Sequence, residues 1–226
     1  MAEQQRVTVD IVVFDGVDEM DFVGPLEVIR SAERLGAGIS ARLVTREPQQ
    51  LVAGGYGLGF VPDGTYVPGK AGVTIVTGGG WVGRDERGAW GEVQRGDWLP
   101  LLAESARRGV VLCGVCTGTL LLAHAGIVGT RRATTHHGAL GDLAALGATV
   151  VTDRVVDDGD LITCGGVTSG IDLALHLVAR ECSPAIAVRV AARMEHNQTA
   201  PVDSIARGDA ARPKRDSRPT SPKRCA

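Results

Sequence analysis

The amino-acid sequence predicts an α/β fold, a doubly wound and mostly parallel β-sheet with helices on both faces. Short apolar runs alternate along the chain with longer segments of helical periodicity, and this alternation is typical of parallel sheets. The run at residues 110–113 is apolar at every position, as in a strand buried on both faces. The chain has 226 residues, enough for one substantial core, so we assign residues 1–198 to a single α/β domain.

The predicted strands are short segments rich in Val, Ile and Leu that end at turn-forming residues. They are residues 7–14, 41–44, 73–77, 110–113, 149–151, 155–156 and 161–163. The third ends at three consecutive glycines, residues 78–80, and the last two are joined by an acidic turn at residues 157–160. Residues 46–70 are rich in glycine, which predicts a β-hairpin or an excursion from the sheet.

The predicted helices are longer segments in which apolar residues recur with helical spacing. They are residues 24–35, 98–107, 117–125, 140–146, 171–180 and 184–196. Pro25 and Pro184 favour the first turn of a helix, where no intrahelical N–H is needed. Gly147 favours a helix end because glycine adopts the left-handed conformation without strain.

The overall composition predicts a cytoplasmic protein without a membrane partner. The formal net charge is -2 and 44% of the residues are hydrophobic. No apolar run approaches the roughly 20 residues that span a bilayer, and the N-terminus lacks the apolar region and cleavage site of a signal peptide. The five cysteines are not spaced like a disulfide scaffold, so we expect free thiols.

Residues 199–226 differ in composition from the rest of the chain. They contain seven Lys and Arg residues, four prolines and almost no large apolar groups. Such a segment cannot bury enough surface to offset the entropy of ordering, so we predict a disordered basic tail. It has no aromatic residue and no nucleic-acid-binding motif, and we predict no nucleic-acid partner.

A cysteine lies at the joint between a predicted strand and a predicted helix. The stretch Gly114-Val115-Cys116-Thr117-Gly118 has the pattern of a nucleophile elbow, with cysteine in the place of serine. A helix N-terminus stabilises a thiolate, which is the nucleophilic form of cysteine. Cys113 belongs to the strand, so the formal C-x-x-C pattern does not predict a redox pair. No second ligand pair accompanies it, so we predict no metal site and no cofactor.

Five motifs occur in one order along residues 7–196: FDGVDEMDFVGPLEV, TGGGW, CGVCTG, RATTH and GGVTSGIDLAL. In these motifs the chain resembles the ThiJ/PfpI superfamily, which is related to class I glutamine amidotransferase domains. Within that superfamily it is most similar to isonitrile hydratases and to the sensor domains of AraC-type regulators. The resemblance implies a flavodoxin-like version of the doubly wound fold and a homodimer with its site near the interface.

The resemblance also implies the catalytic residues. Superfamily members place a carboxyl group against the nucleophilic cysteine, and Asp21 matches that position, with Glu27 as the alternative. Peptidase-like members have a histidine directly after the cysteine; Thr117 stands there instead, as in isonitrile hydratases, and argues against a peptidase. We therefore name Cys116, Asp21 and Thr117 as candidate catalytic residues, and assign Asp18 and Glu19 to the loop surface.

A second group of residues is predicted to bind the substrate or a developing negative charge. Backbone N–H groups of Gly79 and Gly80 follow one strand and are candidates for an oxyanion site. Trp81 is a candidate pocket wall. His136 matches the RATTH motif, and Gly166 lies between the last strand and a helix, at the same edge of the sheet.

The sequence thus predicts an isonitrile hydratase-like lyase that acts on a small-molecule substrate through Cys116. Two alternatives stay open. One is a stand-alone domain that senses a ligand or an oxidant, related to the AraC-type regulators. The other is glyoxalase-like hydration of a reactive carbonyl, although such members usually have glutamate in the place of Asp21.

Overall fold

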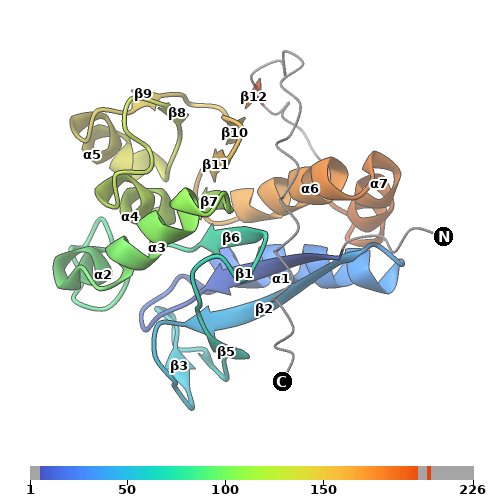
Figure 1. Ribbon diagram of the computed structural model, residues 1–226, viewed down its shortest axis with the longest axis horizontal. Coiled ribbons are helices and arrows are strands. Elements are labelled where there is room, and N and C mark those ends of the chain that lie inside the picture. The colour runs from blue at the N-terminus through green and yellow to red at the C-terminus, as the bar shows by residue number, and fades with distance from the viewer. Residues whose placement is uncertain (1–5, 198–202, 205–226) are drawn as a thin grey trace, which may run out of the picture.

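The strands of the central sheet lie in the order β12-β10-β11-β7-β6-β1-β2-β5 in a computed structural model that describes residues 6–197 and 203–204 (Figure 1). All neighbouring strands are parallel except β10 and β11. The strand bounds are β1 Val7–Val12, β2 Ile39–Thr45, β5 Gly64–Thr65, β6 Val73–Val76, β7 Val111–Val115, β10 Val155–Asp157, β11 Leu161–Cys164 and β12 Asp203–Ser204.

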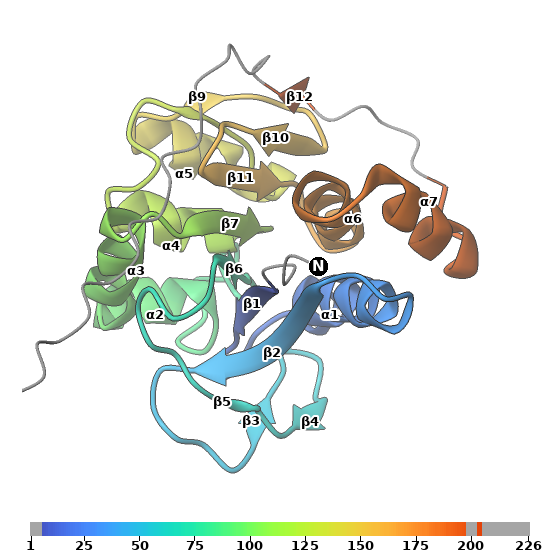
Figure 2. The same cartoon turned by 45° about the vertical axis from the view of Figure 1, so that its right-hand side comes forward.

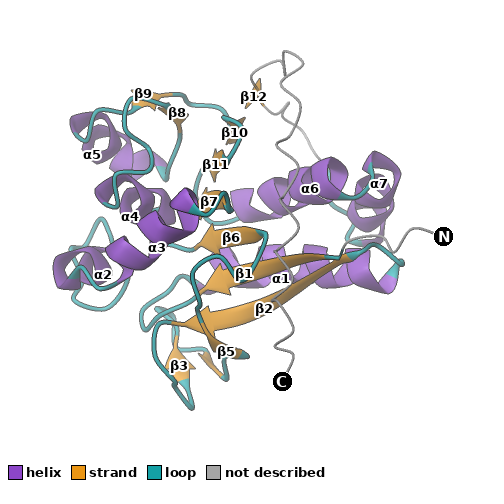
Figure 3. Cartoon of the chain, viewed as in Figure 1, coloured by secondary structure: helices purple, strands orange, loops and turns teal. Residues whose placement is uncertain are grey.

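Helices cover both faces of this sheet (Figures 2 and 3). One group consists of α1 Glu19–Arg34, α6 Ser169–Glu181 and α7 Pro184–Arg193. The other consists of α2 Ala89–Arg95, α3 Trp98–Arg107, α4 Gly118–His124 and α5 Leu140–Ala145, which follows the short 3-10 helix His137–Ala139. The predicted flavodoxin-like fold is therefore confirmed.

The core lies where the central strands meet these helices. Every residue of β6, β7 and β11 is buried, so the prediction of a strand covered on both faces is correct. Leu120, Leu121 and Leu122 of α4 and Leu173 of α6 are fully buried from opposite sides. Most of the buried apolar groups form one contiguous cluster, which holds the carboxyl ends of β1, β6 and β7 close together.

Helix α1 begins five residues earlier than predicted. Asp18 is its N-cap, and the Asp18 carboxylate accepts a hydrogen bond of 3.2 Å from the backbone N–H of Met20. Pro25 lies inside the helix rather than in its first turn. The capping carboxylate and the acidic first turn favour the earlier start, since both complement the unpaired N–H groups there. As a result Asp21 lies in the first helical turn.

Other differences concern short elements at the periphery. The glycine-rich excursion contains a hairpin of β3 (Val52–Ala53) and β4 (Gly59–Phe60), as predicted, and β5 then joins the central sheet. Strand β9 (Thr149–Val150) pairs with the unpredicted strand β8 (Arg132–Ala133) outside that sheet. Helix α2 was not predicted either. Most of the predicted basic tail, residues 199–202 and 205–226, lies outside the described residues.

Neither a membrane-spanning helix nor a metal-binding cluster is present among residues 6–197 and 203–204. No helix there is both long enough and apolar enough to cross a bilayer. No group of three or more His, Cys, Asp or Glu side chains there is arranged to hold a metal ion. The expectation of no metal and no cofactor stays a prediction.

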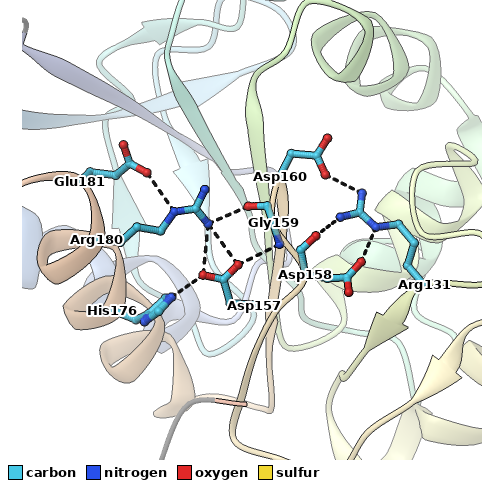
Figure 4. Close-up of polar contacts among 8 residues, drawn as sticks. All are labelled: Arg131, Asp157, Asp158, Gly159, Asp160, His176, Arg180 and Glu181. Carbon is cyan, nitrogen blue, oxygen red and sulfur yellow. Dashed lines mark hydrogen bonds and ion pairs between the residues drawn. The ribbon is translucent and has the colours of Figure 1, made fainter. Parts of the chain in front are cut away.

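A partly buried ionic network joins the turn between β10 and β11 to helix α6 (Figure 4). Asp157 accepts hydrogen bonds from His176 Nε2, at 2.7 Å, and from Arg180 Nη1, at 3.1 Å. Arg180 also donates to the carbonyl of Gly159, and its side chain is only 13% exposed. Burial opposes ionisation of Asp157, but these partners outweigh it and lower its pKa. Across the turn, Arg131 pairs with the carboxylates of residues 158 and 160.

Replacing Asp157 with alanine is expected to lower the free energy of unfolding by about 3 kcal/mol, because the guanidinium of Arg180 loses its main partner in a poorly hydrated place. Urea denaturation at pH 7 measures this. Arg107→Ala is the control, since Arg107 pairs with Glu104 on the exposed face of α3 and its loss should cost less than about 1 kcal/mol. Equal effects in the two variants would contradict the prediction.

Candidate active site

Cys116 occupies the sharp turn between β7 and α4. Its φ is 54°, in the left-handed region that non-glycine residues adopt only under strain. Two hydrogen bonds fix this conformation. The N–H of Cys116 donates to the carbonyl of Gly165 at 3.1 Å, and its carbonyl accepts from Thr135 Oγ1 at 2.7 Å. The predicted nucleophile elbow therefore has the strained geometry of such turns.

The glycines on both sides of the elbow are required by close packing. A Cβ atom at Gly114 would lie 2.4 Å from Thr119 Oγ1, and one at Gly118 would lie 2.1 Å from the carbonyl oxygen of Val76. Both distances are far below van der Waals contact. Helix α4 can thus begin directly against the ends of β6 and β7, which places Cys116 at the carboxyl edge of the sheet.

Asp21 lies beside Cys116, as predicted, although on the first turn of α1 rather than in a loop. Its carboxyl is fully buried, and Oδ2 accepts a hydrogen bond of 2.9 Å from the N–H of Gly78. Burial raises the pKa of Asp21 to about 8, and the negative charge of Asp18 adds to the effect. Hydrogen bonding to Gly78, Cys116 and Val167 opposes the rise. Asp21 is consequently protonated at neutral pH.

The second oxygen of Asp21 is unusual. Oδ1 is buried and has no hydrogen-bond partner of ordinary geometry among the described residues. The thiol of Cys116 and the N–H of Val167 do interact with the carboxyl, and they favour its ionised form. An incompletely satisfied buried oxygen is costly in a structural role. It suits a group that exchanges a proton.

Cys116 is only 5% exposed. Burial raises its pKa first, and the charge of ionised Asp21 raises it further. The N–H groups of Val167 and Thr117 act in the opposite direction, because they hydrogen-bond the sulfur and favour the thiolate. When Asp21 is protonated its charge no longer raises the pKa of Cys116, and burial is then the main effect that still opposes the thiolate. Such a pair supplies a nucleophile and an acid.

The glycine turn after β6 connects the predicted catalytic residues. The N–H of Gly78 donates to Asp21, and the N–H of Gly79 donates to Thr117 Oγ1 at 3.0 Å. The carbonyl of Gly78 accepts from the N–H of Asp18 at 3.0 Å. Thr117 and Gly79 therefore position each other. The predicted oxyanion role of Gly79 and Gly80 stays a prediction.

Trp81 packs away from this turn. It is 3% exposed, and its Nε1 donates to Asp142 Oδ2 at 2.5 Å. Its ring meets Trp90 edge-on at a centroid distance of 5.2 Å, and the guanidinium of Arg84 lies over Trp90. The structure thus places Trp81 between α2 and α5. In this position it anchors the loop that follows the glycine turn. Trp81 does not line the cavity beside that turn, which is described below.

His136 lies against Gly166. These two candidate residues come from different sequence motifs, and their contact is what a shared site requires. A Cβ atom at Gly166 would be 2.3 Å from His136 Cδ2. His136 Nδ1 accepts a hydrogen bond of 3.1 Å from the N–H of Gly138, and its ring stacks on His137 at 4.2 Å. Burial and the neighbouring His137 lower the pKa of His136, while Asp18 opposes this. The imidazole is therefore neutral at pH 7.

A cavity of about 380 Å³ opens beside the glycine turn. It is lined by Gly16, Asp18, Gly54, Gly55, Tyr56, Gly79, Gly80, Asp85 and Arg87. Asp18, which the sequence analysis assigned to the loop surface, therefore faces a space large enough for a small organic molecule. Glu19 is also engaged, since its Oε1 accepts from the N–H groups of Tyr56 and Leu58 and holds the β3–β4 hairpin next to this cavity.

Glu27, the alternative to Asp21, does not belong to the site. Its carboxylate accepts from Arg193 Nη1 at 3.0 Å and from Ser31 Oγ at 3.2 Å. The bond from Arg193 joins α1 to α7, and both bonds lower the pKa of Glu27. The group is ionised and half exposed, which fits a role in helix packing.

Comparison with known proteins gives a context for this geometry. The model of the DJ-1/PfpI family matches residues 7–180, most of the chain. The chain belongs to the DJ-1/PfpI family. It is 34% identical to isonitrile hydratase from Pseudomonas putida over 206 residues, which cover 87% of this chain and 81% of that protein.

Other DJ-1/PfpI relatives include a transcriptional regulator. The chain is 32% identical to the HTH-type transcriptional regulator CdhR from Pseudomonas aeruginosa over 177 residues. These cover 77% of this chain but only about half of the regulator's length, 51%. The crystal structure of a ThiJ/PfpI family protein from Pseudomonas syringae superposes with a TM-score of 0.76 at 28% identity, covering 87% of this chain and 77% of that one.

Sequence reasoning missed one contributor to this DJ-1/PfpI site. Val167 has a φ of 52°, and its N–H interacts with both the Cys116 sulfur and the Asp21 carboxyl. Every residue except proline has a backbone N–H, so the type of residue at position 167 does not indicate this role. The only signal in the sequence is the position of the GGVT stretch, in which Gly166 alone was predicted to belong to the site.

Proposed function

We propose that this protein is an isonitrile hydratase, which converts an isonitrile and water into an N-substituted formamide. The observation that supports this proposal most directly is the pairing of Cys116, on a strained elbow, with a buried Asp21 whose pKa is raised to about 8. The pair places a sulfur nucleophile and a carboxyl proton side by side. The terminal carbon of an isonitrile needs both, because it accepts a nucleophile and a proton at the same atom.

In the first step the thiolate of Cys116 forms a bond to the terminal carbon of the isonitrile, and the proton of Asp21 moves to that carbon. The product is a thioimidate, in which the carbon carries one hydrogen, is bonded to sulfur and is doubly bonded to nitrogen. Asp21 is left as a carboxylate. Covalent catalysis of this kind divides one difficult addition of water into two easier steps.

In the second step water adds to the thioimidate carbon. The Asp21 carboxylate takes one proton from the water and passes it to nitrogen, which gives a tetrahedral adduct. The hydroxyl of that adduct then returns its proton to Asp21 as the carbon–sulfur bond breaks. Formamide leaves, and the Cys116 thiolate and protonated Asp21 are regenerated. The proposed cycle needs no further reactant.

Thr117 supports this reaction better than proteolysis. Its hydroxyl is engaged with the N–H of Gly79, and no histidine stands next to the nucleophile in sequence. The relationship to Pseudomonas putida isonitrile hydratase extends over most of both chains. The cavity lined by Asp18 and Gly79 is our candidate for the substrate-binding space.

Cyclohexyl isocyanide tests the proposal directly. The purified protein is expected to consume it, which infrared spectroscopy follows as loss of the N≡C stretch, with formation of N-cyclohexylformamide, which chromatography identifies. Absence of turnover by the folded protein, from pH 6 to pH 8 and at millimolar substrate, would overturn the proposed reaction.

A sensor function is the second candidate, and the similarity to CdhR favours it. In this function Cys116 would bind a ligand covalently or be oxidised without turning over. Mass spectrometry after mild peroxide treatment separates the two candidates. A sensor should form a sulfenic or sulfinic acid at Cys116 at low oxidant, whereas a hydratase that turns over isonitrile needs no such sensitivity.

We also propose a homodimer located in the cytoplasm. Large apolar side chains are exposed along and beside the β3–β4 hairpin, namely Leu51, Tyr56, Leu58 and Val61. This segment is next to the cavity, since Tyr56 lines it. A second copy of the chain over this face would cover the apolar groups and narrow the entrance to the site.

A further inference from the structure

Val167 is a β-branched residue in a conformation that such residues rarely adopt. Its φ of 52° lies in the left-handed region, where a branched side chain crowds the backbone. A strained backbone of this kind persists only when the surrounding structure holds it. The segment that contains this peptide contacts the elbow directly, since the carbonyl of Gly165 accepts the N–H of Cys116 at 3.1 Å. The N–H of Val167 also favours the ionised forms of Cys116 and Asp21.

Arg154, just before β10, holds the segment around Val167 from both ends. Its backbone carbonyl accepts a hydrogen bond of 3.0 Å from the N–H of Gly165, two residues before Val167. Its Nη2 donates to Thr168 Oγ1 at 3.0 Å, one residue after Val167. The backbone and the side chain of Arg154 thus hold residues on both sides of the strained peptide.

The guanidinium of Arg154 is itself held in place. Its Nε donates to Asp172 Oδ2 at 2.5 Å, and Asp172 lies in the first turn of α6 with a side chain only 9% exposed. The other oxygen of Asp172 pairs with His196 Nε2 at 2.9 Å, just after α7. Asp172 on α6, itself held by His196 after α7, therefore fixes the orientation of the Arg154 guanidinium.

We propose that Arg154 is a positioning residue for the nucleophile, which keeps the Val167 N–H on the sulfur of Cys116 by bracketing residues 165–168. Loss of the side chain removes the bond to Thr168 and leaves only the backbone bond to Gly165. The Val167 peptide can then relax toward negative φ, and its N–H leaves the sulfur. The thiolate loses a hydrogen bond while the site keeps its shape. This inference rests on the use of Cys116 as a nucleophile in the proposed function.

The test measures the ionisation of Cys116 in the full-length chain with Cys182→Ser and Cys225→Ser. Among the described cysteines, Cys113 and Cys164 are fully buried, so iodoacetamide reports on Cys116 in this background. The rate of alkylation is measured from pH 5 to pH 10 for this protein and for Arg154→Met and Arg154→Lys. Arg193→Met is the matched control, because Arg193 is also paired on a helix but contacts Glu27 and Ser31.

Burial raises the pKa of Cys116 well above its ordinary value, so the alkylation rate on the rising limb of the profile reports the midpoint. Arg154→Met is expected to lower this rate about tenfold at each pH, which corresponds to an upward shift of the midpoint by about one pH unit. Arg154→Lys should show most of this change in alkylation, since an ammonium group cannot make the two guanidinium hydrogen bonds to Thr168 and Asp172 at once. The other titratable groups that act on Cys116 are Asp21, Asp18 and Cys164, and they are the same in every variant. Arg193→Met should leave the midpoint unchanged.

An unchanged midpoint in folded Arg154→Met, as judged by circular dichroism, would overturn the inference. If that variant does not fold, Arg154→Lys and Asp172→Asn decide by the same criterion. The alkylation readout needs no isonitrile. A shifted midpoint in a protein that does not hydrate isonitriles would therefore reject the proposed function and retain the role of Arg154. With turnover, kcat should fall while KM stays within about twofold.

Discussion

Replacement of Cys116 with alanine is expected to abolish the conversion of cyclohexyl isocyanide into N-cyclohexylformamide, with kcat falling by about 10⁴-fold or more. In the proposed cycle the sulfur forms the bond that activates the isonitrile carbon, and no other nucleophile takes its place among the described residues of the site. Cys116→Ser should be almost as inactive, because an alcohol with the same shape is not ionised at neutral pH. Chromatographic time courses of formamide measure both losses.

The chain offers a matched control for this variant in Cys113, three residues earlier. Cys113 lies fully buried inside β7 rather than on the elbow, and burial raises the pKa of its thiol. Cys113→Ala should therefore keep kcat within about tenfold and lower only stability, by a cavity cost of about 1–2 kcal/mol. Retention of more than a tenth of wild-type turnover by Cys116→Ala, or equal losses in the two alanine variants, would contradict the role of Cys116.

The elbow could be predicted because its chemistry depends on residue types. Glycine is required at positions 114 and 118, where any Cβ would collide with Thr119 or with the end of β6. A steric constraint of this kind fixes the residue type and can therefore be recognised in the sequence. The parallel core strands were predictable for the same reason, since burial on both faces demands apolar residues at every position.

Contributions of the backbone and of long-range packing could not be predicted in this way. The N–H of Val167 acts on Cys116 whatever side chain follows it. Trp81 follows the glycine turn and looked like a pocket wall, but an acceptor on α5, distant in sequence, binds its indole N–H. The start of α1 depended on a competition between Asp18 as a cap and Pro25 as a first-turn residue. The outcome moved Asp21 from a loop onto a rigid helix.

Asp21→Asn is expected to abolish turnover and at the same time to stabilise the protein at neutral pH. The amide oxygen can keep the hydrogen bond from Gly78, while its NH₂ group cannot give a proton to the isonitrile carbon. We expect a loss of kcat of about 10²–10⁴-fold, the range of a general acid. In the wild type, turnover should fall as the pH rises past about 8, where Asp21 loses its proton.

The stabilisation follows from the sign of the pKa shift. The folded pKa of Asp21 is raised to about 8 from an ordinary value of 3.8. Between these two values the folded chain keeps a proton that the unfolded chain has released. The free energy of unfolding therefore falls as the pH rises, by up to about 1.4 kcal/mol per unit from this one group. Below pH 3.8 the contribution is fully present, and above about pH 8 it is lost.

Asparagine does not titrate, so urea denaturation of Asp21→Asn at pH 5 and pH 8 should show a smaller decrease than in the wild type, by about 2–4 kcal/mol. A carboxylate with a structural role would behave in the opposite way, since its loss would lower both stability and turnover. Opposite signs of the two effects would identify Asp21 as a group held in the site at the expense of stability. That is the expectation for a buried acid whose second oxygen has no regular hydrogen-bond partner among the described residues.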